Sequence, residues 1–454
     1  MISRRIINTR KPLLEKIVFF LLCVLFVYPI LPHAIQSITI IALTTLSVVT
    51  YADAIKNNLT RLSVKPFLWF SGWFLVLMLT VLYSEDVNEG IKRITRGVNF
   101  VIIPFLFLYI LPEIPYKKQK ILSNLFVFAH VLLLCFLVYK TFEGVDRIGY
   151  RDSSGRLIKG LFDENIFKQV AIVFQMPFYL SRYYIDENNI TTFFIHKVYL
   201  SIGLVFSVFL MVNKFIKEKM SLIHKLLWGV LIVIFIVAIV YFTSLPNILM
   251  ILVLPAFIFM NLKHKKHKVI MAMLAVITIG TTFTKPLYTK IYEDKRLLTD
   301  ALEAKNMLLS IIDDKPYVEG TNIRLEVWRC AYKQISKQWL FGYGIGDEEA
   351  ILHNCYISKN CKDCLGLNSH NYYASLLLMS GVVGLVLFII SLLYAIKLAI
   401  KTDNYLLIMF IILCAINLIS ENLFVRIHGV LFYSIIGSYM LAISLNKNHQ
   451  LEKR

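Results

Sequence analysis

The chain has 454 residues, of which 57% are hydrophobic and only 17% charged, and its mean hydropathy is +0.66. A soluble domain carries charge on about a quarter of its residues, so this composition excludes an ordinary soluble protein and indicates a chain built for lipid. The formal net charge is +19. Between Lys285 and His370, however, acidic and basic residues are equal in number, so the excess lies in short connections and termini. That distribution follows the positive-inside rule and argues against nucleic acid as a partner.

Apolar stretches long enough to cross a bilayer recur along the chain. A transmembrane helix needs about 20 mostly apolar residues. The candidate segments are Ile17–Leu31, Ala34–Ile55, Pro66–Tyr83, Ile94–Leu111, Ile121–Phe142, Ile166–Tyr184, Phe193–Val212, Leu226–Thr243, Asn247–Asn261, Val269–Phe283, Tyr372–Ile400, Tyr405–Ser420 and Ile427–Leu445.

The charges at the two ends of the chain limit the number of spans. Both Met1–Lys16 and Asn446–Arg454 are basic, which places both ends in the cytoplasm and requires an even number of spans. One candidate is therefore not a simple span. Ile166–Tyr184 is the one that we exclude, because Lys168 would be costly inside a bilayer. The prediction is an all-α polytopic membrane protein with about 12 transmembrane helices.

The basic connections also predict how the chain is organised. Residues 1–284 form an N-terminal transmembrane bundle with a short outward loop at 143–165, and residues 285–371 form one large periplasmic loop. Residues 372–454 form the last transmembrane helices and a cytoplasmic tail. The large loop faces outward because the basic connection Lys263–Lys268 before it faces the cytoplasm. Apolar positions at steps of three to four predict helices within it over Leu297–Leu309 and Asn322–Gln338.

Glycines mark two places near the end of this loop. Gly342, Gly344 and Gly346 would end a helix and let the backbone approach something closely. Gly381 and Gly384 lie in the apolar helix that follows, where they favour close helix packing.

Four of the seven cysteines lie in the polar loop. His353, Cys355, Cys361 and Cys364 are residue types that bind zinc, but their spacing is not that of a standard site. On the oxidising side of a membrane disulfides are favoured. We expect no metal and one disulfide within the loop, with its partners open, while Cys330 is either buried or joins them.

The order of the loop motifs resembles the O-antigen ligase and polymerase superfamily. The matching parts are Asn322–Ile323–Arg324 with Trp328 four residues on, the glycine run, Ser369–His370–Asn371 and Ser420–Glu421–Asn422. The resemblance implies a bacterial inner-membrane glycosyltransferase that moves a glycan from undecaprenyl diphosphate to an acceptor at the periplasmic face, with no cofactor and no metal. It also implies that Arg324 is the loop arginine of the family and His370 its loop histidine.

The chemistry of these two residue types agrees with such a reaction. A diphosphate leaving group gains negative charge, and Arg binds phosphate oxygens with a permanent charge and two parallel hydrogen bonds. An acceptor hydroxyl must lose a proton, and His is the commonest general base. The plainer alternatives are that His370 caps the next helix with Ser369 and Asn371, and that Arg324 pairs with Glu326 or Asp314. Glu421 is most simply the ion-pair partner of Arg426, although it could approach the site.

Further substrate contacts are less well defined. The family tends to have a second arginine at an outer turn, but the corresponding turn here, Thr243–Asn247, has none. Arg147, Arg151 or Arg156 of the shorter outward loop could bind diphosphate instead, or form a solvated cluster. Lys168 either lines a donor cavity or faces the bundle interior. Asn371, beside His370, is a further candidate for substrate binding.

Several functions share this chemistry. An O-antigen ligase, which transfers the glycan to lipid A–core, is preferred because one loop dominates. A polymerase would join a second lipid-linked glycan instead, and a protein O-oligosaccharyltransferase is a third alternative. A transporter of lipid-linked glycan would need a charged pathway through the spans, and these spans are poor in charge. All of these functions require contact with membrane lipids.

Overall fold

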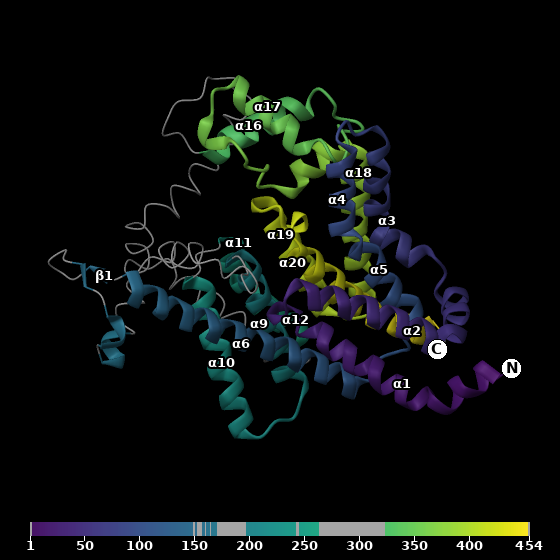
Figure 1. Ribbon diagram of the computed structural model, residues 1–454. Coiled ribbons are helices and arrows are strands. Elements are labelled where there is room, and N and C mark those ends of the chain that lie inside the picture. The colour runs from purple at the N-terminus through teal and green to yellow at the C-terminus, as the bar shows by residue number, and fades with distance from the viewer. Residues whose placement is uncertain are drawn as a thin grey trace. The chain divides into compact units, whose positions relative to one another are not determined.

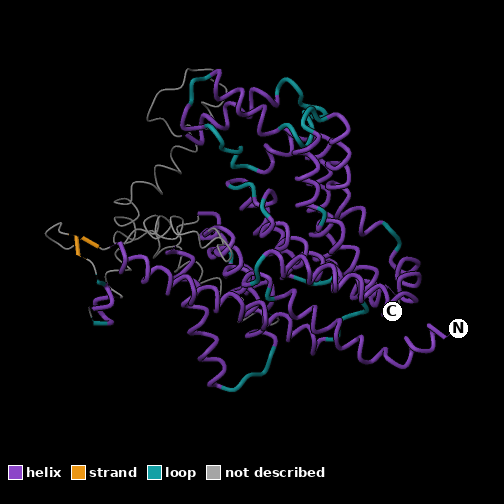
Figure 2. Tube along the Cα trace, in the orientation of Figure 1, coloured by secondary structure: helices purple, strands orange, loops and turns teal. Residues whose placement is uncertain are grey.

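The computed structural model describes residues 2–148, 150–151, 157–158, 160–163, 165–169, 197–241, 245–262 and 323–452. Helices make up most of this part of the chain (Figure 2). Two short antiparallel strands, β1 (Tyr150–Arg151) and β2 (Leu157–Ile158), form a hairpin. Within the described ranges, eight helical segments are long and apolar enough to cross a membrane. The predicted all-α polytopic class is therefore confirmed.

Most predicted spans correspond to helices. The long apolar helical segments are His33–Asp53, Lys65–Tyr83, Val87–Ile110, Tyr116–Lys140, Val198–Lys217, Leu222–Val240, Tyr372–Lys401 and Ile427–Glu452. Pro246–Asn261 and Tyr405–Ser420 are shorter apolar helices. The span predicted at Ile17–Leu31 is not among the eight, because its helix ends at Phe26 and begins in basic sequence. Val269–Phe283, Leu297–Leu309 and most of Ile166–Tyr184 lie outside the described residues, so the count of 12 stays a prediction.

Two compact units make up the chain, and the first comprises residues 1–46, 115–211 and 221–244. The helices α1 and α6 pack against each other in it, and the rings of Phe126 and Phe206 lie 5.9 Å apart. Its elements are α1 (Ile2–Phe26), η1 (Tyr28–Ile30), the start of α2 (His33–Leu62), α6 (Tyr116–Ile148), the hairpin, η4 (Leu161–Asp163), most of α9 (Lys197–Lys217) and α10 (Leu222–Tyr241).

The second unit comprises residues 47–114, 212–220 and 245–454, and it contains Arg324 and His370. Its elements besides the ends of α2 and α9 are α3 (Lys65–Leu79), η2 (Thr80–Tyr83), α4 (Val87–Gly97), α5 (Asn99–Phe105), η3 (Leu106–Ile110), α11 (Leu245–Leu252), α12 (Leu254–Asn261), α16 (Ile323–Ile335), α17 (Glu348–Ser358), η5 (Lys362–Cys364), α18 (Tyr372–Lys401), α19 (Tyr405–Ser420), η6 (Leu423–Val425), α20 (Ile427–Leu431), η7 (Phe432–Gly437) and α21 (Ser438–Glu452).

An aromatic cluster forms the core of the second unit. Trp73 of α3 is fully buried, and its ring lies 5.0 Å from the rings of both Phe100 in α5 and Phe388 in α18. Phe424 of η6 stacks on the same indole at 6.1 Å. Large aromatic side chains bury much apolar area and favour edge-to-face contacts. The cluster joins the helices α3, α5 and α18 to η6, and α3 and α18 run side by side in Figure 1.

The helix α18 is broken at Gly381, where φ is 62° and ψ −162°. We call residues 339–346 the strap, because this segment runs along the break. Carbonyl oxygens freed at the break accept N–H groups of the strap. The carbonyl of Leu378 accepts the N–H of Tyr343 at 2.7 Å, and the carbonyl of Met379 accepts the N–H of Gly344 at 3.0 Å. In return, the N–H of Val382 donates to the carbonyl of Trp339 at 2.8 Å. Broken helices need such partners, since unsatisfied backbone groups are costly near lipid.

Glycine is required on both sides of this contact. A Cβ on Gly381 would lie 2.1 Å from the carbonyl oxygen of Leu340, and one on Gly342 would lie 2.6 Å from that of Leu378. Both residues have positive φ, a conformation that costs other residues free energy. The close backbone approach predicted for the glycine run therefore occurs. Gly381, which we expected in helix–helix packing, instead breaks its helix against the strap.

The far end of the strap is fixed to the start of α4. The carboxylate of Asp347 accepts the N–H groups of Glu85 at 3.0 Å and Asp86 at 2.8 Å. A Cβ on Gly346 would lie 2.0 Å from the carbonyl oxygen of Asp86. The strap thus connects the N-terminal end of α4 to the first part of α18, two helices that are far apart in the sequence.

We predict that Gly381→Ala lowers the thermal unfolding temperature of the detergent-solubilised protein. The backbone at position 381 is in a region open almost only to glycine, and forcing Ala into it costs roughly 1–3 kcal/mol. The matched control is Gly72→Ala in α3, where an added Cβ meets nothing within 4 Å and the helix gains about 1 kcal/mol. Equal shifts for the two variants would contradict the assigned role of the break.

Candidate functional site

The helix α16 carries two residues of the predicted motif on one face. Arg324 and Trp328 are four residues apart, so their side chains lie one above the other. The indole N–H of Trp328 donates to the carbonyl oxygen of Ser369 at 3.0 Å. Ser369 directly precedes His370. The Trp328 contact therefore brings the Arg324 end of α16 to the segment that carries His370.

The backbone at His370 is held in an unusual conformation. Its φ is +48°, and few residues other than glycine adopt positive φ. The N–H of His370 donates to the side-chain oxygen of Asn368 at 3.0 Å. The next residue, Asn371, caps α18 by accepting the N–H of Ala374 at 3.1 Å. These contacts fix the backbone of His370 at the start of α18.

Glu421 lies between the two predicted residues. One carboxylate oxygen is 3.9 Å from Nη2 of Arg324, and the other is 3.7 Å from Nδ1 of His370. About half of the Arg324 side chain is exposed, while His370 and Glu421 are about a quarter exposed. The structure thus brings Arg324 and His370 together through a residue at the end of α19. The expected Glu421–Arg426 ion pair does not form among the described residues.

A buried network of polar side chains lies behind this cluster. Arg93 of α4 contacts the fully buried carboxylate of Glu348 at 2.5 Å, and the hydroxyl of Ser375 donates to the same carboxylate. The amide of Asn422 donates to Ser375 at 2.8 Å and to Ser369 at 3.1 Å. The two serine hydroxyls are 2.8 Å apart.

The network ends on both sides of the site. Ser369 precedes His370, and Asn422 follows Glu421, so the hydrogen bonds between Ser369 and Asn422 hold two backbone segments that carry the imidazole and the carboxylate. Satisfied buried networks of this kind fix a single geometry. Sequence reasoning missed Arg93 and Glu348, since the contact joins residues more than 250 positions apart. For Glu421 the sequence left two alternatives open, an ion pair with Arg426 or an approach to the site, and the structure brings its carboxylate to Arg324 and His370.

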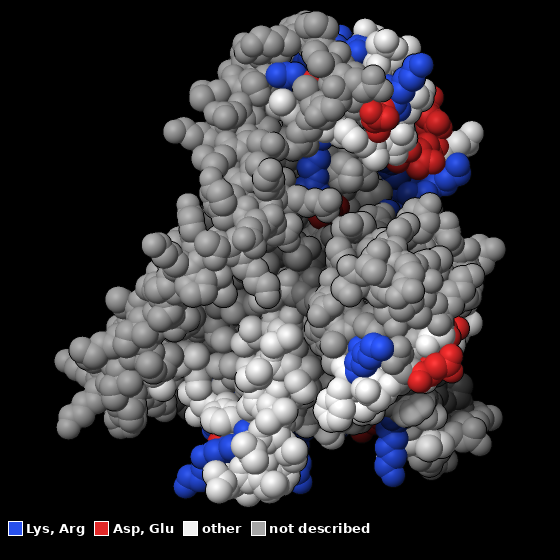
Figure 3. All heavy atoms as spheres, turned by 90° about the vertical axis from the view of Figure 1, so that its left-hand side faces the viewer, with Lys and Arg blue, Asp and Glu red and all other residues white. Residues whose placement is uncertain are grey.

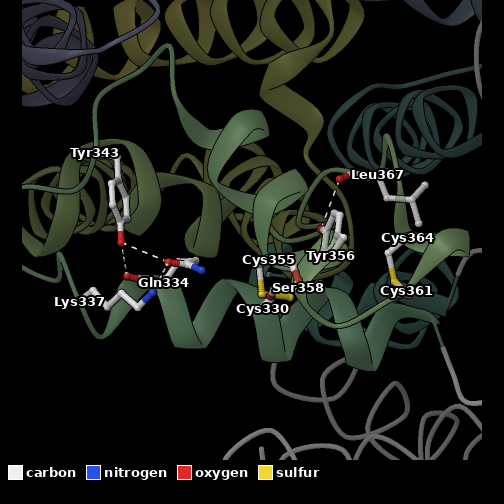
Figure 4. The surroundings of a disulfide bond; sticks show 10 residues. All are labelled: Cys330, Gln334, Lys337, Tyr343, Cys355, Tyr356, Ser358, Cys361, Cys364 and Leu367. Atoms are coloured by element: carbon white, nitrogen blue, oxygen red, sulfur yellow. Dashed lines mark hydrogen bonds between the residues drawn. A yellow bond between two sulfur atoms is a disulfide. The ribbon is translucent and has the colours of Figure 1, made fainter. Parts of the chain in front are cut away.

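Two disulfides hold the loop helices together. Cys330 of α16 is bonded to Cys355 of α17, and Cys361 is bonded to Cys364. The sequence predicted one disulfide in the loop, and the structure has two. Of the two alternatives for Cys330, the structure shows that it joins the disulfide-bonded cysteines. Beside them, burial and the nearby Glu348 raise the pKa of Tyr356. The Tyr356 hydroxyl therefore stays protonated and donates to the carbonyl of Leu367 at 3.3 Å (Figure 4).

Most of the other residues predicted to bind substrate lie in a different part of the sequence from Arg324, His370 and Glu421. Arg147 lies in the last turn of α6, Arg151 lies in β1, and Lys168 is exposed, with its backbone N–H bonded to the side chain of Asn165 at 2.9 Å. All three belong to the first unit. Arg156 lies outside the described residues. Their role in substrate binding stays a prediction, and so does that of Asn371, whose side chain is used in capping.

Charges on the loop are mixed in sign. Figure 3 shows Lys, Arg, Asp and Glu side chains intermingled at the upper end of the molecule, where α16 and α17 lie. Within the described ranges, no group of three or more His, Cys, Asp or Glu side chains is placed to hold a metal ion.

Comparison with known families agrees with these features. Residues 229–389 match the family model described as O-antigen ligase. The match includes Arg324, the strap, His370 and the break in α18, and it supports the resemblance to the O-antigen ligase superfamily that the motif order predicted. The match supports a function of the O-antigen ligase or polymerase type in general, and the long apolar helices indicate a multi-pass membrane protein. The comparison with curated proteins found no match.

We predict that Glu348→Gln strongly destabilises the protein. Removing one partner of a buried ion pair leaves an uncompensated charge and costs about 3–5 kcal/mol. Glu349→Gln is the matched control, because Glu349 contacts the same arginine at 2.8 Å but its side chain is 59% exposed. Exposed pairs contribute about 1 kcal/mol or less. Thermal unfolding in detergent measures both, and equal losses would contradict the importance of burial.

Proposed function

We propose that the chain is a polyprenyl-diphosphate-dependent glycosyltransferase that ligates O-antigen to lipid A–core at the periplasmic face of the inner membrane. The observation that carries the proposal is the cluster of Arg324, Glu421 and His370, with Nη2 of Arg324 and Nδ1 of His370 both within 4 Å of one carboxylate. A guanidinium for the diphosphate and an imidazole for the acceptor are the two groups that this transfer needs. The family match covers Arg324 and His370.

The proposed reaction is a direct displacement at the anomeric carbon. The acceptor hydroxyl oxygen attacks this carbon and forms the new glycosidic bond. The bond to the diphosphate oxygen breaks, and undecaprenyl diphosphate leaves with the electron pair. Arg324 stabilises the charge that grows on the leaving diphosphate. His370 takes the proton of the acceptor hydroxyl.

Glu421 has a defined part in this proposal. Its carboxylate faces Nδ1 of His370, which leaves Nε2 for the acceptor hydroxyl. A carboxylate on the far side of an imidazole orients the ring and stabilises the imidazolium that forms when the proton arrives. The buried network behind Ser369 and Asn422 keeps the imidazole and the carboxylate in place.

We expect His370→Asn to lower the rate of glycan transfer by about 10²–10⁴-fold, the usual contribution of a general base. Asn is chosen because it tolerates positive φ better than most residues, so the backbone turn survives. The assay follows purified protein with undecaprenyl-diphosphate glycan and lipid A–core. His353→Asn is the control, since His353 is an exposed histidine of the same loop. Full transfer by a folded His370→Asn or Arg324→Ala variant would refute the residue assignment.

Glu421→Gln should slow transfer about 10- to 100-fold, because a charge-assisted contact to the imidazolium is lost while the shape is kept. The effect is expected in kcat, since the imidazolium forms only as the proton moves. Measuring kcat and KM separately for donor and acceptor tests this. An unchanged kcat would remove Glu421 from the mechanism and leave it as a structural partner of Arg324.

A polymerase is the second candidate function. The observation that favours it is the hairpin of β1 and β2, because it gives the shorter outward loop 143–165 ordered structure of its own. Polymerases of this superfamily often have two substantial outer loops. A strain lacking the protein separates the candidates. Unligated long glycan on its carrier indicates a ligase, whereas lipid A–core bearing a single repeat unit indicates a polymerase.

A transporter would behave differently from both enzymes. Movement of lipid-linked glycan across vesicles by wild-type protein, with no transfer product when donor and acceptor are both supplied, would refute the enzymatic proposal.

A further inference from the structure

Two adjoining hollows open on the loop at the C-terminal end of α16. One has a volume of about 530 Å³ and lies between α16 and α17. The other, of about 410 Å³, lies between the strap and the outer end of η2. Gln338, Tyr343 and Ile351 line both. We call the two hollows together the loop cleft, and their volumes are in the range of small-molecule sites.

Three side-chain amides line the loop cleft, together with charged and hydroxyl groups. Gln334, Gln338 and Asn354 face it. The amides of Gln338 and Asn354 have no hydrogen-bond partner in the part of the chain that the structure describes. An amide both donates and accepts hydrogen bonds. This is the chemistry that matches neighbouring hydroxyl groups, which also donate and accept.

The remaining lining residues argue against a charged ligand. Lys337 at one end is opposed in sign by Glu85 at the other, and the Asp347 carboxylate is already bonded to two N–H groups. The rings of Tyr83, Phe341 and Tyr343 supply apolar surface, on which the apolar face of a sugar ring can pack. The lining is thus close to neutral, polar and aromatic, and it suits a saccharide better than a phosphate.

The walls of the loop cleft are held in place before any ligand binds. The hydroxyl of Tyr343 donates to the carbonyl oxygen of Gln334 at 3.0 Å, and the strap is bonded to α18 on its other side. The Cys330–Cys355 disulfide joins α16 to α17 beside Ser358, as Figure 4 shows. Burial also raises the pKa of Tyr343, so its hydroxyl remains a donor. A preformed site loses less entropy on binding.

We propose that the loop cleft is a saccharide subsite, which holds a part of the lipid-linked glycan several sugars away from the reacting diphosphate. The inference rests on the proposed transferase function. Arg324 and Gln334 stand at opposite ends of α16, about 15 Å apart at 1.5 Å per residue. A glycan with one sugar at the site therefore reaches the cleft only if it is several residues long.

The test varies glycan length with full-length protein in nanodiscs. Donors carrying a single sugar and donors carrying many repeat units are each assayed with Asn354→Trp, which fills the cleft, and with Gln338→Ala. The matched control is His353→Trp, the same change one residue earlier on the exposed surface of α17. We expect the two cleft variants to raise KM for the long donor by about threefold to tenfold, the effect of losing one or two hydrogen bonds. The short donor and kcat should be unaffected.

The outcomes separate the source of the glycan and the two proposals. If the cleft variants raise KM only for long donors, the cleft binds the donor glycan. If they raise KM only for long acceptors, it binds the acceptor glycan. Both results support a saccharide subsite. The subsite is overturned if the cleft variants change KM equally for all glycan lengths, or if His353→Trp has the same effect as the cleft variants. If wild type transfers nothing, the proposed function fails, and the cleft is then judged by NMR binding of the free oligosaccharide released from its carrier. Binding that Asn354→Trp does not weaken overturns the subsite.

Discussion

The backbone contact between the strap and the broken helix α18 is the constraint on which the second unit depends. A helix that is interrupted within an apolar stretch leaves carbonyl and N–H groups without partners, and water is scarce there to satisfy them. Residues 339–346 supply those partners. Because both backbones approach so closely, glycine must stand at Gly342 and Gly381. The polar loop is therefore joined to the spans by main-chain hydrogen bonds and not only by its chain ends.

The buried ion pair of Arg93 and Glu348 follows from this arrangement. Asp347, which follows the strap directly, binds the start of α4, and Glu348 is the next residue. Once the strap is in place, Glu348 is carried into the interior and needs the Arg93 guanidinium. Buried pairs seldom add net stability, but they are strongly unfavourable when one partner is missing. The pair consequently fixes one packing of α4, α17 and α18, and its hydrogen bonds through Ser375 extend this order to Ser369 and Asn422.

The site and the loop cleft divide the work of handling a long lipid-linked glycan in our proposals. The charged cluster of Arg324, Glu421 and His370 lies at the start of α16, and the neutral amide-rich cleft lies at its end. Charged side chains stabilise the diphosphate, because negative charge grows on it during the reaction. Hydrogen-bond donors and acceptors bind the sugars, whose charge does not change. One rigid helix, tied by a disulfide and by Trp328, sets the spacing between the two.

Much of the fold class was determined by the sequence alone. Apolar length and the balance of charge are local properties, so the spans at Pro66–Tyr83 or Tyr372–Ile400 could be read directly from the chain. The glycine run and Ser369–His370–Asn371 marked the loop ends because positive φ and helix capping also depend on local residue type. What only the tertiary structure decided is which distant groups meet: Glu421 with His370 and Arg324, Arg93 with Glu348, Cys330 with Cys355. These contacts join segments up to hundreds of residues apart, and no periodicity or spacing records them, because side-chain pairing across a fold is set by packing of the whole unit.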